Sequence, residues 1–273
     1  MSRACRGTDS LFRNFALSYR MKRRPRKINS RECSPSLPPA CSMIKSAIKT
    51  ALDKLKIRPM YFGVNLYDDF RRWLPNQPFS VLFDVGANEG QTIRAFRSNF
   101  PNAKSIHCFE PNPDCCKKLG TLGVRVHQTA LGNEIGEIGF DRSHGQSDMY
   151  FVTHDATEKV TIETLDGFCE REGINQIDFL NIDAEGYDLN VILGASKMLS
   201  RNQIDIIQAE VSMNAENTYH VPFTQVHQAL ESFGYRLFGV YEQGFEWGRH
   251  VPVLRRSNVV YTSPKTCELN RLR

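Results

Sequence analysis

The sequence lacks any apolar run that approaches the roughly 20 residues needed by a membrane-spanning helix, so it predicts no transmembrane segment. None of its 8 cysteines forms a C-x-x-C pair, and the adjacent Cys115 and Cys116 do not match the usual zinc-ligand spacings. Glycine (18) and proline (13) are near average usage and no internal repeat is evident, which excludes collagen-like and repeat proteins. The 273 residues, 41% hydrophobic and 24% charged, have a globular composition with room for one large or two small domains.

Acidic side chains are scarce near the N-terminus. Residues 1–60 hold 15 basic and 3 acidic side chains, a balance of +12, while the rest of the chain carries −7. Residues 1–42 are rich in Arg, Ser and Pro and are predicted to form a basic, poorly ordered arm. Basic arms often bind nucleic acid or anionic membranes. The acidic remainder argues against a broad polyanion-binding face, so we expect no nucleic acid on the folded body.

The arm contains no long apolar segment, so an ordinary secretory signal is not predicted. Its Arg- and Ser-rich composition resembles a transit peptide. Two other interpretations stay open, a solvated tail and a start of translation at Met43. The unpaired cysteines are typical of a reducing compartment and favour the cytoplasm. The sequence does not indicate an oligomeric state.

Helical and extended patterns alternate after the arm. Apolar spacing predicts helices at residues 43–57 and 67–75, which together form a helical lead-in over 43–78. In the remaining domain, residues 79–273, strands are predicted at 79–86, 104–111, 124–132, 176–186, 204–211, 235–242 and 255–264, with further extended pieces at 136–143 and 159–168. Helices are predicted at 89–101, 112–120, 187–199 and 223–234.

This alternation predicts an α/β fold, a doubly wound and mostly parallel sheet with helices on both faces. In such sheets the ligand lies beyond the carboxyl ends of the strands. The residues that follow each predicted strand are therefore the first candidates for a functional site.

A glycine-rich turn follows the first strand, in the segment Phe83–Gly90. Gly86 and Gly90 allow a tight strand-to-helix turn beside a ligand. The spacing is G-x-x-x-G, not the G-x-G-x-x-G of a dinucleotide fingerprint, and no Walker lysine follows. The glycines alone are equally compatible with an ordinary turn.

Acidic residues end two further strands. Glu110 ends the second, where a carboxylate is placed to accept hydrogen bonds from a ribose diol, or to cap the helix that follows. Asp183 ends the strand at 176–186, and it and Glu185 are candidates for a base, metal ligands or substrate contacts. For Glu185, a helix-dipole role is an equal alternative.

Together these segments resemble the FkbM-type methyltransferase family. The resemblance rests on Asp84–Gly90, Phe109–Pro113, Glu163–Phe168 and Ile177–Ala195, with further similarity up to residue 262. It implies a class I, Rossmann-like fold and an S-adenosylmethionine-dependent O-methyltransferase. Asn181 stands where the family commonly has lysine, so a cationic role there does not carry over.

The resemblance also implies roles for individual residues. The methionine part of the cofactor would be bordered by Asp84, Gly86, Ala87, Asn88 and Gly90. Glu110 would take the ribose hydroxyls, the segment ending at Ala130 would lie near adenine, and Asp183 would stand at the point of methyl transfer.

The acceptor hydroxyl needs a group that takes its proton. Asp183 is the first candidate, and His144, His154 and His220 lie in predicted loops as further ones, with His144 chosen for the catalytic set. A divalent ion between Asp183 and Glu210 is an option, because both residues end adjacent strands.

We therefore predict a methyltransferase acting on a hydroxyl of a sugar, glycan or other small-molecule acceptor. Three alternatives stay open: an RNA-binding protein or RNA methyltransferase that uses the basic arm, a catalytically silent scaffold with the same fold, and a nicotinamide oxidoreductase, which the glycine spacing disfavours.

Overall fold

A computed structural model describes residues 62–141, 151–152, 156–245 and 253–271. The chain divides into two compact units, Met1–Pro59 and Met60–Arg273, and every described residue belongs to the second. The basic arm and the helix expected at 43–57 lie outside the described residues. No helix in the described ranges combines the length and apolarity needed to cross a bilayer.

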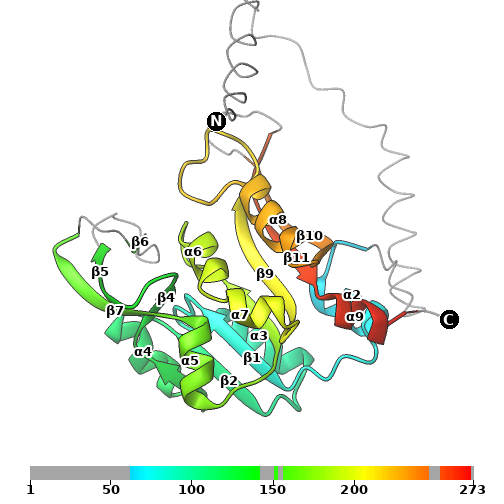
Figure 1. Cartoon of the computed structure of the whole chain (residues 1–273), viewed down its shortest axis with the longest axis horizontal. Helices are drawn as coiled ribbons and strands as arrows, with labels where there is room; N and C mark the ends of the chain where they lie inside the picture. The colour runs from blue at the N-terminus through cyan, green and yellow to red at the C-terminus, as the bar shows by residue number, and fades with distance from the viewer. Residues whose placement is uncertain (1–61, 142–150, 153–155, 246–252, 272–273) are drawn as a thin grey trace, which may run out of the picture. The chain divides into compact units, whose positions relative to one another are not determined.

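The main sheet has seven strands within the described residues, in the order β10-β11-β9-β8-β1-β2-β3 (Figure 1). The five strands from β9 to β3 pair in parallel, whereas β11 is antiparallel to both of its neighbours. This confirms the predicted mostly parallel sheet. Its strands are β1 (Val81–Val85), β2 (Ser105–Phe109), β3 (Arg125–His127), β8 (Ile177–Ile182), β9 (Ile204–Ser212), β10 (Arg236–Phe245) and β11 (Leu254–Thr262).

Successive residues of the central strands supply two separate cores, because side chains alternate across a sheet. On β1, Phe83 and Val85 pack into one core, and Leu82 packs into the other. The first core includes residues of α5 (Leu165–Glu172), α6 (Asp188–Leu193), α7 (Ser196–Ser200) and α8 (Phe223–Ser232). The second includes residues of α2 (Leu66–Trp73), α3 (Gln91–Asn99) and α4 (Pro113–Gly120). Helices thus cover both faces, as predicted.

Several segments differ from the expected pattern. The helix predicted at 187–199 is two helices, α6 and α7, and α5 and α9 (Pro264–Leu269) are not among the predicted helices. The strand predicted at 124–132 is split into β3 and β4 (Ala130–Gly132), and β4 joins a second sheet of order β4-β7-β5-β6. The extended piece predicted to reach Phe168 ends at Thr164, whose side chain caps α5 by accepting from Gly167 N at 3.1 Å. The cap stops the strand because its side chain satisfies a backbone donor of the new helix. The remaining strands of the second sheet are β5 (Gly136–Asp141), β6 (Phe151–Val152) and β7 (Glu158–Thr164).

Helix α2 packs directly on the sheet. Its Phe70 is fully buried, with ring centroids 5.2 Å from Phe79 and 5.6 Å from Phe179 of β8. Asn65 caps the helix by accepting from Asp68 N at 3.0 Å. This part of the expected lead-in therefore shares its core with the strands of the main sheet.

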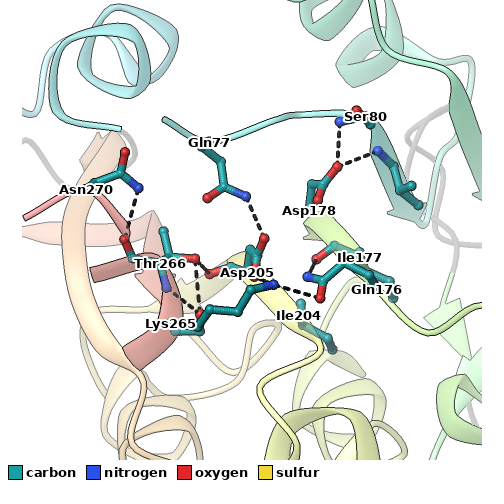
Figure 2. A network of polar contacts seen from close by, with 12 residues as sticks. Gln77, Ser80, Gln176, Ile177, Asp178, Ile204, Asp205, Lys265, Thr266 and Asn270 are labelled. Carbon is teal, nitrogen blue, oxygen red and sulfur yellow. Dashed lines mark hydrogen bonds and ion pairs between the residues drawn. The ribbon is translucent and has the colours of Figure 1, made fainter. Parts of the chain in front are cut away.

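The amino ends of β8 and β9 are fixed by buried carboxylates. Figure 2 shows Asp205 between Gln77, whose amide donates to it at 2.7 Å, and the Lys265 ammonium at 3.1 Å. The neighbouring Asp178 accepts from the backbone of Ser80 and, at 2.8 Å, of Val81. These bonds join the entry to β1, the start of β9 and helix α9 (Pro264–Leu269). This end of the sheet serves stability and leaves the carboxyl ends free.

Replacing Asp205 tests this network. We expect Asp205→Ala to lower the free energy of unfolding by about 2–3 kcal/mol, because the Gln77 amide is left buried with an unmet donor. Urea denaturation of both proteins measures the change. Asp114→Ala, which removes an exposed carboxylate, is the control. A loss below about 0.5 kcal/mol, the usual range for surface changes, would contradict the interpretation.

Candidate functional site

A cavity of about 530 Å³ lies at the carboxyl ends of the central strands. Its wall includes Gly86, Ala87 and Asn88 after β1, Glu110 after β2 and Asp183 after β8. Ala130 of β4 also lines it, and so does the start of α2. The volume falls in the range of small-molecule and cofactor sites. Most of the residues predicted for cofactor binding therefore share one cavity.

Gly86 permits the close contact that shapes this cavity. A Cβ at this position would lie 1.9 Å from the carbonyl oxygen of Asp183, and its φ of +76° is in the left-handed region. The backbone N–H of Asp183 donates to Val85 O at 2.9 Å beside this contact. Glycine is therefore required where the chain leaving β8 crosses the chain leaving β1.

Glu110 is a buried carboxylate with a fixed orientation. Its Oε2 accepts from the backbone N–H of Asn88 at 2.9 Å and its Oε1 from that of Asn112 at 2.8 Å. Burial raises the pKa of Glu110, and these two donors oppose the rise by stabilising the anion. Each oxygen can accept a further hydrogen bond. Glu110 therefore offers two oriented acceptors to a ligand in the cavity.

Two of the predicted cofactor residues do not line the cavity. Gly90 is the N-cap of α3 with a φ of +82°, in the left-handed region, and a Cβ there would lie 2.5 Å from the Leu122 side chain, so glycine is needed for the turn itself. Asp84 is fully buried behind the wall, on β1. The predicted catalytic residue His144 lies outside the described residues, and so does the alternative His154.

Asp84 belongs to a row of polar side chains that crosses three strands. Asn181 of β8 donates from Nδ2 to Asp84 Oδ1 at 2.8 Å, and Gln208 of β9 donates from Nε2 to Asn181 Oδ1 at 2.9 Å. The three residues are in register across the sheet. Among the described residues, Asp84 Oδ2 and Gln208 Oε1 have no hydrogen-bond partner. Asn181 thus joins Asp84 to Gln208 through a neutral amide.

Sequence reasoning did not propose several residues of the cavity. Asn181 and Gln208 stand in the middle of largely apolar strands, and a polar residue at the centre of a buried strand is the signal that identifies such positions. The others come from α2, β10 and β11, far away in the sequence, and had no local signal. They include Asn65, Tyr67, Tyr241, Glu242 and Asn258.

Asp183 is open to the cavity while protein encloses it on its other sides. Its side chain is exposed and accepts no hydrogen bond from any described residue. Loss of water around it raises its pKa to about 8, and the nearby carboxylates of Asp188, Glu185 and Asp84 add to the rise. An accessible carboxylate of this kind is a stronger base than a solvated one.

Three potential metal ligands lie beside Asp183. Glu210 of β9, the loop residue His220 and Glu185 each place one ligand atom within 4.8 Å of the others. His220 Nε2 lies 2.8 Å from Glu210 Oε2, and Arg256 also pairs with Glu210. Desolvation lowers the pKa of His220, against the effect of Glu185 and Asp188. The sequence analysis named all three residues but paired Glu210 with Asp183.

The methyltransferase FkbM domain family matches residues 84–237, more than half of the chain. The chain belongs to the FkbM methyltransferase family. The match spans the segments from β1 to the start of β10 that form most of the cavity wall. It confirms the family predicted from the sequence, and with it a methyltransferase for which S-adenosylmethionine is supported as methyl donor.

Two relatives of this FkbM methyltransferase are named as methyltransferases of stated specificity. The 2-O-methyltransferase NoeI of Sinorhizobium fredii is 27% identical over 184 residues, which cover 59% of this chain and 74% of that protein. The hexuronic acid methyltransferase AglP of Haloferax volcanii is 26% identical over 151 residues, covering 50% of this chain and 59% of that protein. Among solved structures, an FkbM methyltransferase of Methylobacillus flagellatus has a TM-score of 0.46 at 15% identity, covering 68% of this chain and 44% of that one.

The buried charge of Asp84 predicts a pH-dependent stability. Burial raises the pKa of Asp84 to about 7, Asn181 opposes the rise and Glu110 adds to it. The folded chain therefore keeps a proton between about pH 4 and 7 that the unfolded chain has lost. The loss of folding stability caused by the buried Asp84 charge is therefore complete above pH 7 and absent near pH 4.

We expect Asp84→Asn to stabilise the ligand-free protein at pH 8 by on the order of 2–4 kcal/mol. The new amide keeps an acceptor for Asn181 without the charge. Denaturant unfolding at pH 8 and pH 5 measures the difference, which should shrink at the lower pH. Glu137→Gln, at an exposed position of β5, is the control. An equal effect at both pH values would contradict a charge-based origin.

Proposed function

We propose that this FkbM methyltransferase transfers a methyl group from S-adenosylmethionine to a hydroxyl of a sugar or glycan. The observation that carries the proposal is the position of Asp183, an accessible carboxylate in the same cavity as the oriented acceptors of Glu110. The names of the two relatives, a 2-O-methyltransferase and a hexuronic acid methyltransferase, support a sugar acceptor.

The cavity residues fit the cofactor chemically. Glu110 would accept hydrogen bonds from the two ribose hydroxyls, one at each carboxylate oxygen. The backbone of Gly86–Asn88 would border the methionine part, and Ala130 the adenine. Asp84 lies behind this wall with an oxygen that has no partner among the described residues, so a nearby cationic group would compensate its charge.

Asp183 would accept the proton of the acceptor hydroxyl. The cofactor, when bound, supplies a methyl group on a positively charged sulfur. The hydroxyl oxygen would bond to that methyl group as the carbon–sulfur bond breaks, and Asp183 Oδ would take the hydroxyl proton. The products are the methyl ether and S-adenosylhomocysteine. The protein's main contribution is to align the acceptor oxygen with the methyl group.

The remaining part of the cavity is suited to a polyhydroxylated acceptor. Tyr67, Gln208 and Asn258 contribute polar groups to its wall. The raised pKa of Tyr67, which burial brings to about 12, keeps its hydroxyl protonated as a donor. These donors and acceptors, which come from separate elements, suit the several hydroxyls of a sugar ring better than they suit an apolar acceptor molecule.

Glu110→Ala tests the ribose contact. We expect the affinity for S-adenosylhomocysteine to fall by about 1–3 kcal/mol, because two hydrogen bonds to a charged acceptor are lost. Isothermal titration calorimetry on the full chain measures it. Glu110→Gln, which keeps one carbonyl acceptor, should lose less, and Glu137→Ala, at an exposed position of β5, should lose nothing. Unchanged affinity in a folded Glu110→Ala protein would contradict the assignment.

Asp183→Asn tests the base. We expect turnover of a sugar acceptor to fall about 10²–10⁴-fold, the usual contribution of a general base, while S-adenosylhomocysteine affinity changes far less. In the wild type, kcat/KM should rise with pH through about 8, because Asp183 must lose its proton to act. The same rise in kcat should lie at lower pH, since the bound sulfonium favours the carboxylate. Full turnover in the variant would remove Asp183 as the base.

A further inference from the structure

Glu185, Glu210 and His220 form a cluster of ligating side chains that the proposed methyl transfer does not use. One ligand atom of each lies within 4.8 Å of the other two. Glu210 and His220 are buried, whereas Glu185 is half-buried and lines the cavity. The cluster is therefore buried at Glu210 and His220 and reaches the cavity through Glu185.

Backbone contacts bring the cluster together. A Cβ on Gly186 would lie 2.2 Å from the carbonyl oxygen of Tyr219, so the loop of Glu185 touches the loop of His220 because residue 186 is glycine. The far side of the second loop is held to β9, where Ser212 N donates to Val221 O at 2.8 Å. The main chain therefore positions all three ligands before anything binds.

The charge of this cluster is not balanced. The Glu185 carboxylate has no hydrogen bond or ion pair with any described residue. Asp188, three residues further along the chain at the start of α6, is fully buried, and its Oδ1 has no partner within the described ranges. Arg256 pairs with Glu210, and its single positive charge is set against three carboxylates, those of Glu185, Glu210 and Asp188. A bound cation would offset the excess negative charge.

The surroundings of His220 suit a metal ligand. Its Nε2 faces Glu210, and its Nδ1 lies 3.0 Å from Asn217 Nδ2 and 3.2 Å from Asn217 Oδ1. With a metal on Nε2, the Nδ1–H donates to the amide oxygen of Asn217, as an outer partner does for many metal-bound histidines. Without a metal, the Nε2–H donates to Glu210 and the amide N–H of Asn217 donates to Nδ1. Asn217 can therefore form a hydrogen bond with His220 Nδ1 both with and without a bound metal.

We propose that Glu185, Glu210 and His220 bind one divalent transition-metal ion at the edge of the cavity. Two carboxylates and one imidazole suit Mn²⁺, Fe²⁺ or Zn²⁺, whereas Ca²⁺ prefers a larger set of oxygen ligands. Three protein ligands leave coordination positions open, as in catalytic metal sites. The binding of the ion does not rest on the proposed function. A role of the ion in holding an acceptor hydroxyl beside Asp183 rests on the proposed function.

Manganese titration tests the site. Tag-free full-length protein, stripped of metal with a chelator, is titrated with Mn²⁺ while the electron paramagnetic resonance signal of the free ion is followed, and Zn²⁺ is added as competitor. We expect one Mn²⁺ per chain, displaced by Zn²⁺. Glu185→Gln should weaken Mn²⁺ binding at least about tenfold, the minimum seen even for outer partners of metal sites. This variant removes no hydrogen bond within the described residues, so the fold should persist.

Two further variants complete the test. His220→Gln should weaken Mn²⁺ binding to a similar extent, while Glu137→Gln, an exposed carboxylate of β5 outside the cluster, should bind as the wild type does. Absence of Mn²⁺ and Zn²⁺ binding at millimolar concentration would overturn the proposal. Equal affinity in the wild type and the Glu185→Gln protein would do the same. S-adenosylhomocysteine titrated into the same samples reports on the cofactor pocket, so failure of the proposed function is seen separately.

Discussion

The contact between Gly86 and the backbone of Asp183 is the constraint on which the rest of the site depends. It holds the ends of β1 and β8 together with no space for a side chain between them. Asn88 can then donate to Glu110, and Asp183 can face the cavity that Glu110 lines. Any residue larger than glycine at position 86 would push these strand ends apart and change the distance between the carboxylates of Glu110 and Asp183.

Negative charge collects at this end of the sheet. Burial raises the pKa of Asp84 and Asp188 to about 7 and that of Asp183 to about 8, and nearby carboxylates add to the rise at Asp84 and Asp183. The ligand-free site therefore holds protons at neutral pH that a cationic ligand would displace. A sulfonium cofactor and a divalent ion are the two cations in the proposals. Each would bind more tightly because it relieves the unfavourable negative charge of these carboxylates.

The two ends of the strands have separate tasks. At the amino ends, Asp178 and Asp205 have partners for their carboxylates in backbone N–H groups, an amide and a lysine. At the carboxyl ends, Asp183 and Glu185 have no hydrogen-bond partner among the described residues. Satisfied carboxylates stabilise the sheet, and unsatisfied ones beside a cavity remain available to a ligand. The same residue type therefore serves stability at one end and chemistry at the other.

The sequence by itself determined the order of strands and helices, the mostly parallel sheet and the strand-end positions of Gly86, Glu110 and Asp183, because local periodicity and turn residues encode them. It also carried the motifs of the FkbM family. Tertiary structure alone decided that Asp84 lies behind the wall, that Asn181 joins it to Gln208, and that Glu185 meets Glu210 and His220. These contacts join residues 20 or more positions apart, and no local pattern sets the distance between them.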